Sequence, residues 1–144
     1  MIAMRNLILM LLVGAIFSLN CNTVKLDPKA MAAKLGQEWV INSLMGNKLN
    51  PSNFIGGLPS LNFDTDKGLV NGKLSCNNVN GKFDVTKGLD FSNLVSTRKA
   101  CAKGADEESQ ILNSLQKVNN FGFKGDELEL KDGKNVLMSL LPKK

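Results

Sequence analysis

Three cysteines are the side chains with the clearest chemistry in this chain of 144 residues. Cys21 follows an uncharged stretch near the N-terminus, where the chemistry to consider is attachment of a lipid. Cys76 and Cys101 can form one disulfide in an oxidising compartment, closing a loop of about 25 residues that would contribute about 3 to 4 kcal/mol to stability. Spacing alone does not show that their α-carbons are close enough, so two buried free thiols remain the alternative.

Basic residues beside Cys101 offer one route to thiol chemistry. Thr97, Arg98 and Lys99 precede this cysteine, and nearby positive charge lowers the pKa of a thiol and makes it nucleophilic. The alternative, which we favour, is that Arg98 pairs with a carboxylate of the fold. The chain contains no histidine, so it lacks the commonest general base and transition-metal ligand. We therefore expect no catalytic residue, metal site or cofactor, and we expect that the protein is not an enzyme.

Two further motifs are weak indications of a binding site. Asp64 and Asp66 would share one face of a continuing strand, but no further oxygen ligands follow at the spacing of a calcium loop. A solvated turn is the favoured interpretation. Gly56 and Gly57 lack the lysine and the following helix of a phosphate-binding loop, so we interpret them as part of a flexible loop.

The N-terminal segment has the pattern of an export signal. Arg5 is followed by an uncharged run over residues 7–19, shorter than the roughly 20 apolar residues of a membrane-spanning helix. We predict a signal peptide at residues 1–20 and a lipid anchor on Cys21, which would attach the protein to the membrane. Asn20 stands where lipoprotein signals favour Gly, Ala or Ser, so cleavage without lipidation is the alternative. Either way we expect export to the bacterial cell envelope, as a membrane-anchored lipoprotein or in the periplasm.

Composition and charge describe one globular domain. Hydrophobic residues make up 43% of the chain and charged residues 22%, and this length is enough for a single core. The net charge of +5 comes from basic residues spread along the chain, whereas proteins that bind nucleic acid gather such residues on one face. We therefore expect no nucleic-acid partner.

The elements that would position these residues are mostly short strands. We predict a tether and short helix at residues 21–36, because Asp27 and Pro28 have the pattern of an N-cap and a first helical residue. A β-rich domain follows at residues 37–142. Its strand-like runs lie near Trp39, Leu61, Leu69, Phe83, Phe121, Leu128 and Val136.

One turn and one longer helix complete the prediction. Asn80 and Gly81 are typical of a two-residue hairpin turn. Residues 105–118 form one amphipathic helix, with acidic residues at its start and Ile111 and Leu115 on its apolar stripe. No alternation of strands and helices favours a parallel sheet. The predicted fold class is α+β, an antiparallel β-rich meander curled toward a barrel with this one helix packed against it.

Three segments of the domain carry a family resemblance. They are SCNNVNGKF from Ser75 to Phe83, LDFSNLVSTRKAC from Leu89 to Cys101, and the ending ELELKDGKNVLMSL. From Trp39 onward the chain resembles the META domain family, which includes the HslJ-like heat-shock lipoproteins. Ser75 stands where that family usually has glycine.

The resemblance implies a compact β-rich domain that is often exported or lipid-anchored and is associated with stress and antibiotic tolerance in bacteria. It implies no catalytic residues, and it places two cysteines where Cys76 and Cys101 stand. We expect a stress-associated envelope domain that binds a protein or envelope component through its sheet surface and the loop at residues 46–60. The alternatives are a structural or inhibitory role and, third, a thiol-dependent enzyme acting through Cys101.

Overall fold

The computed structural model describes residues 27–86, 89–91 and 93–144 of the chain. The predicted signal peptide at residues 1–20 and the predicted lipidation of Cys21 lie outside the described residues. None of the helices in the described part of the chain has the length and apolar character that crossing a membrane requires.

Two α-helices form where the sequence predicts them. Helix α2 (Pro28–Leu35) begins after Asp27, whose carboxylate accepts a hydrogen bond from the Lys29 backbone N–H at 3.0 Å, as an N-cap does. Helix α3 (Ala105–Leu115) has three acidic residues in its first turn, which favourably face the positive end of the helix dipole.

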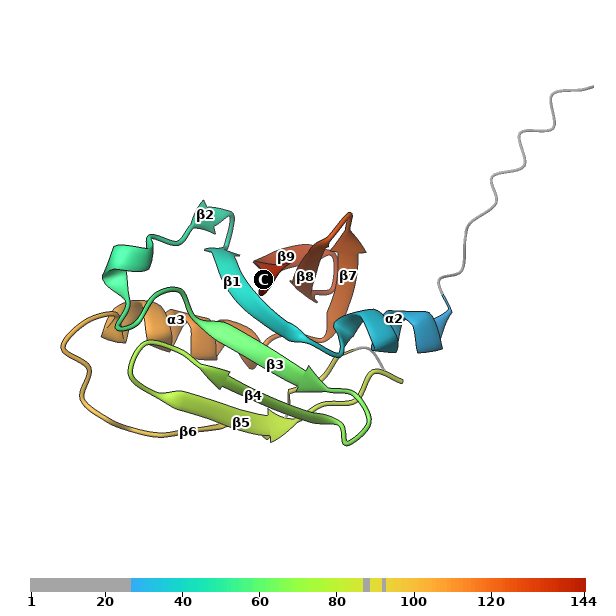
Figure 1. Cartoon of the computed structure of the whole chain (residues 1–144), viewed down its shortest axis with the longest axis horizontal. Coiled ribbons are helices and arrows are strands. Elements are labelled where there is room, and N and C mark those ends of the chain that lie inside the picture. Colours follow the sequence, from blue (N-terminus) through green and yellow to red (C-terminus); the bar gives the residue numbers. More distant parts are fainter. Residues whose placement is uncertain (1–26, 87–88, 92) are drawn as a thin grey trace, which may run out of the picture.

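Nine strands within the described residues form one antiparallel sheet in the order β6-β5-β4-β3-β1-β9-β8-β7, with β2 paired to β1 off this path. The α+β class and the antiparallel arrangement are confirmed, but the sheet is not closed into a barrel, because β6 and β7 end it (Figure 1). The strands are β1 (Glu38–Leu44), β2 (Asn47–Lys48), β3 (Ser60–Asp64), β4 (Leu69–Lys73), β5 (Asn78–Lys82), β6 (Val95–Ser96), β7 (Asn120–Lys124), β8 (Glu127–Asp132) and β9 (Asn135–Pro142).

The core lies against the inner face of this sheet. Strands β3, β4 and β5 run side by side in the lower part of Figure 1, and β7, β8 and β9 lie in its upper part. Alternate residues of β3, Leu61 and Phe63, are buried, as the two-residue period of a strand requires. Ile111 and Leu115 of α3 join the same core. The sheet therefore has one buried face, and its other face is available to solvent along β3 to β5.

The predicted hairpin turn at Asn80 and Gly81 is wrong. Both residues lie inside β5, where Asn80 pairs with Asn71 of β4. The chain turns earlier, at the loop where the Leu74 backbone N–H donates to the Asn77 carbonyl at 2.8 Å. Glycine at position 81 serves close packing, because a Cβ there would lie 2.7 Å from Cδ2 of Leu94.

Two other segments differ from the predicted pattern. The predicted loop at residues 46–60 contains β2 and a short 3-10 helix, Pro51–Asn53. The predicted run near Phe83 forms no strand. Its backbone contacts include a hydrogen bond from the Phe83 N–H to the Gly68 carbonyl at 2.9 Å and an isolated bridge between Asp84 and Asp90. Residues 87–88, where a turn was expected, lie outside those residues.

Candidate functional site

A disulfide joins two of the segments that carry the family resemblance. Cys76, in the loop between β4 and β5, is bonded to Cys101, and their α-carbons are 5.7 Å apart, inside the range that a disulfide needs. The same loop contains Ser75, whose backbone does not adopt a positive φ and whose hydroxyl donates to the Lys103 carbonyl at 2.7 Å. Serine is therefore accommodated at this position without strain.

Asn77, which is itself buried, is the centre of a polar cluster beside the disulfide. Its amide Oδ1 accepts hydrogen bonds from Thr97 Oγ1 and from the Lys99 backbone N–H, both at 2.8 Å. Its Nδ2 donates to the Lys99 carbonyl at 3.2 Å and to Glu108 Oε1. We call Asn77, Thr97, Lys99 and Glu108 the Asn77 cluster. It ties the loop before β5, the chain after β6 and helix α3 into one unit.

Glu108 is the buried acid of this cluster. It lies on α3 with only 5% of its surface exposed, and its Oε2 accepts hydrogen bonds from the backbone N–H groups of Ser75 at 2.9 Å and Asn77 at 3.3 Å. Within the described residues no lysine or arginine forms an ion pair with it. Three N–H donors therefore stabilise this carboxylate in place of a cationic side chain.

The predicted basic residues next to Cys101 are exposed. Arg98 lines a groove of about 430 Å³ between β6 and α3. Its expected carboxylate partner is not found among the described residues, where ion pairs involve other side chains. The sulfur of Cys101 is held in the disulfide, so this state has no thiol for Arg98 to activate.

The other weak motifs are turns. Strand β3 ends at Asp64, whose carboxylate accepts a hydrogen bond from the Lys67 backbone N–H at 3.0 Å and pairs with Lys67 Nζ at 3.1 Å. Hydrogen bonds from Lys67 hold the pKa of Asp64 below its usual value. Gly56 and Gly57 both have positive φ angles, 81° and 97°, in the loop before β3. Neither motif brings together a set of cation or phosphate ligands.

The outward face of β3, β4 and β5 carries an unusual concentration of asparagine. Asn62, Asn71 and Asn80 are direct cross-strand partners, so their side chains form a row across three strands, with about 4.8 Å between neighbouring strands. Asn78 stands on the same face two residues before Asn80. These four side chains make no hydrogen bond to another described residue. We call this surface the amide face.

Charged residues flank the amide face on one side. Glu38 of β1 is the cross-strand partner of Asn62 and thus extends the row. Its carboxylate accepts hydrogen bonds from Lys143 Nζ at 2.7 Å and Ser60 Oγ at 2.9 Å. The hydrogen bond from Lys143 is the main reason that the pKa of Glu38 lies below its usual value. Lys73 lies beside this row, in a depression of about 470 Å³ over the face.

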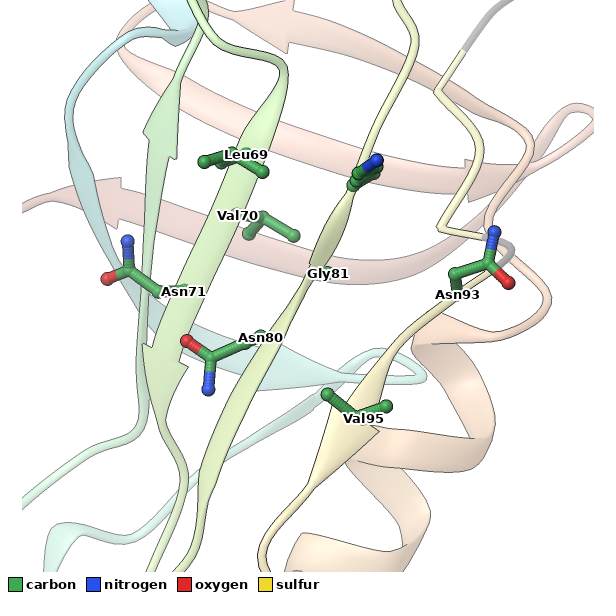
Figure 2. A pocket seen from close by; sticks show the side chains of 8 residues that line it. Leu69, Val70, Asn71, Asn80, Gly81, Asn93 and Val95 are labelled. Carbon is green, nitrogen blue, oxygen red and sulfur yellow. The ribbon is translucent and has the colours of Figure 1, made fainter.

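A second hollow of about 460 Å³ continues the surface toward β6. Figure 2 shows Leu69 of β4 and Val95 of β6 on opposite sides of β5. Asn80 of β5 is the cross-strand partner of both Asn71 and Val95, so Val95 continues the row of asparagines at its β6 end. Leu69 is 39% exposed and Val95 66% exposed. The combined surface can therefore offer amide hydrogen bonds in its middle and apolar contact at its edge.

The amide face is not among the sites predicted from the sequence. One pattern in the sequence does indicate it. Asn78 and Asn80 stand at alternate positions of a strand in which polar residues on the solvent face alternate with an apolar residue on the core face. Only the pairing of three strands brings Asn62, Asn71 and Asn80 into one row, and that pairing depends on the β4–β5 turn that was misplaced.

Comparison with known proteins gives a family and a fold. A family model described as the META domain matches residues 31–144. No curated protein sequence matches the chain significantly. A protein from Burkholderia xenovorans, solved by NMR, superposes with a TM-score of 0.63 at 19% identity over 81% of this chain and 88% of that one.

Two further solved structures are similar in fold. One NMR structure has a TM-score of 0.59 at 18% identity, covering 81% of this chain and 94% of the other. The crystal structure of a DUF4847 family protein from Bacteroides vulgatus has a TM-score of 0.53 at 13% identity, covering 76% and 94%. At these identities the similarity concerns the fold alone.

Proposed function

Because this chain belongs to the META domain family, we propose that it is an exported, lipid-anchored and non-catalytic domain of the bacterial cell envelope. Its task is to bind a polar component of that envelope through the amide face. The uncharged run before Cys21 supports export and lipidation. The stress association of the family supports a role under envelope stress.

The row of Asn62, Asn71 and Asn80 is the observation that carries the binding role. Asparagine is depleted in strands because it packs poorly on a pleated surface, so strand stability does not account for three in register. Each side-chain amide offers two donors and one carbonyl acceptor. An open row of such groups suits a ligand rich in hydroxyl and amide groups.

The chemistry of these groups favours binding over catalysis. Amides neither ionise in the physiological range nor act as nucleophiles, whereas acid–base catalysis needs groups that exchange protons near the working pH. Cys76 and Cys101 are joined in a disulfide, so neither offers a free thiol that could act as a nucleophile or an acid–base catalyst. A thiol-dependent reaction through Cys101 is therefore not part of the proposal.

Binding of residues 27–144, which contain every described element, to isolated bacterial envelopes tests this role. A triple variant, Asn62→Ala, Asn71→Ala and Asn80→Ala, should lower the affinity measured by co-sedimentation at least about tenfold, because each lost hydrogen bond is worth roughly 1 kcal/mol. Its control carries Asn47→Ala, Asn113→Ala and Asn135→Ala, three exposed asparagines elsewhere on the domain.

The control variant should bind like the unmodified domain, and circular dichroism should show that all three proteins are folded. Unchanged binding of the amide-face variant would refute the proposed surface. Such a result would favour the structural or inhibitory role, in which the rigid domain sterically blocks or stabilises a partner or binds it through another surface.

A further inference from the structure

Three potential metal ligands converge at the disulfide. One ligand atom from each of Cys76, Cys101 and Glu108 lies within 4.8 Å of the others. The sulfur of Cys101 is 3.8 Å from Oε2 of Glu108. In a tetrahedral zinc site, with Zn–S of about 2.3 Å and Zn–O of about 2.0 to 2.2 Å, neighbouring ligand atoms lie roughly 3.5 to 4 Å apart. The distance from Cys101 to Glu108 is thus close to that between neighbouring ligands of a metal site, whereas the two bonded sulfurs have to move apart after reduction.

The carboxylate of this group is buried without a cation. Glu108 is 5% exposed, and its partners are the N–H groups of Ser75 and Asn77 and the side-chain amide of Asn77. No ion pair neutralises it within the described residues. A divalent ion beside it would supply the positive charge that the protein does not.

We propose that reduction of the Cys76–Cys101 disulfide creates a binding site for a zinc-like divalent cation, with the two thiolates and the Glu108 carboxylate as its ligands. A dithiol reductant supplies the two electrons and two protons, the S–S bond breaks, and the reductant leaves as its own disulfide. The ion then displaces the two thiol protons into solvent. Water fills the fourth position, because both cysteines are partly exposed.

Asn77 is placed to support such a site. Its Nδ2 lies 3.4 Å from the sulfur of Cys101 and 3.7 Å from that of Cys76, so it can donate a weak hydrogen bond to a thiolate. The same group also donates to Glu108. Outer-shell donors of this kind orient metal ligands and stabilise their anionic forms.

Cobalt(II) is the probe that tests the proposal, because bound thiolates give it a charge-transfer absorption. The full chain carries Cys21→Ser, so that Cys76 and Cys101 are its only thiols, and is kept in mild non-ionic detergent. After reduction with a phosphine, we expect one ion per chain, the thiolate absorption, and release of two protons per ion in weak buffer. The oxidised protein should show none of these. Absence of the absorption, or of stoichiometric proton release, from the reduced protein would overturn the proposal.

The substitution Glu108→Gln tests whether the carboxylate of Glu108 is a ligand of the ion. Loss of an outer-shell partner alone typically weakens metal binding about 10- to 100-fold, so loss of this proposed ligand should weaken cobalt binding by the reduced protein at least about tenfold. The matched control is Glu107→Gln on the same helix, whose side chain accepts a hydrogen bond from Asn53 at 2.9 Å, and it should bind like the parent. Circular dichroism of the reduced proteins checks their folding. Equal cobalt affinity of the two variants would show that Glu108 is not a ligand. If Glu108→Gln does not fold, the number of protons released per cobalt ion by the parent protein still tests the proposal.

Discussion

At the scale of single residues, Asn77 holds together segments that are far apart in the sequence. Its side chain is 4% exposed and bonds to Thr97, Lys99 and Glu108. Asn77→Ala would deprive the buried Glu108 carboxylate of one hydrogen-bond donor and would remove the hydrogen bonds to Thr97 and to the Lys99 backbone. We expect a loss of about 3 kcal/mol in the free energy of unfolding, measured by urea denaturation.

The neighbouring Asn78→Ala is the matched control. The Asn78 side chain is exposed and unbonded among the described residues, so its removal should change stability by less than about 0.5 kcal/mol. Equal effects of the two substitutions would show that the Asn77 cluster does not stabilise the domain.

Glu38 gives a dependence of stability on pH. Its hydrogen bond from Lys143 lowers the folded-state pKa, so its contribution is complete above the unfolded-state pKa and is lost as pH falls through the folded-state pKa. The ion pair is partly exposed, and solvent screening limits its contribution to less than about 1 kcal/mol. Glu38→Gln should therefore be slightly destabilising at pH 7, and this difference should vanish below the folded-state pKa. A difference that grows on acidification, in urea titrations across that range, would contradict the assignment.

At the scale of elements, Gly72 sets how closely β4 packs against its neighbours. A Cβ at this position would lie 2.7 Å from Leu61 Cδ2 and 3.1 Å from Val79 Cγ1, and it would also clash with the Ser60 carbonyl oxygen. Gly72→Ala should destabilise the domain by about 1 to 3 kcal/mol in thermal or urea unfolding.

Gly122→Ala is the corresponding change in β7. There a Cβ would meet only the flexible end of a lysine side chain, at 3.3 Å, so we expect a change within about 1 kcal/mol of zero. If Gly72→Ala were equally harmless, the packing seen around β4 would be looser than the structure indicates.

Local patterns predict most of the elements but not their partners. Both helices have caps or acidic starts that act within a few residues, and the closing strands β7 to β9 show apolar alternation between clear glycine turns. The hairpin turn predicted at Gly81 is wrong because this glycine allows close packing against Leu94, thirteen residues away in the sequence. The amide face and the burial of Glu108 depend in the same way on distant pairing. Of the features of the candidate site, only the disulfide is predicted from the sequence. The family resemblance implies it, and the spacing of the cysteines leaves it as one of two alternatives.

At the scale of the whole molecule, helix α2 is the element nearest the predicted tether. Its Lys34 contacts the sheet at the turn between β7 and β8, whereas the amide face lies on other strands. Lys34 of α2 donates to the Gly125 carbonyl at 2.6 Å, in the turn between β7 and β8. The amide face lies on β3, β4 and β5, on the other side of β1 in the sheet order (Figure 1). A lipid anchor upstream of α2 would therefore leave the binding surface open.

Intact-mass spectrometry of protein extracted from bacterial membranes tests export and anchoring most directly. We predict a chain that begins at Cys21, carries acyl groups, and is lighter by two hydrogen atoms because Cys76 and Cys101 are bonded. The mass of the complete 144-residue chain with all three sulfurs reduced would contradict the account.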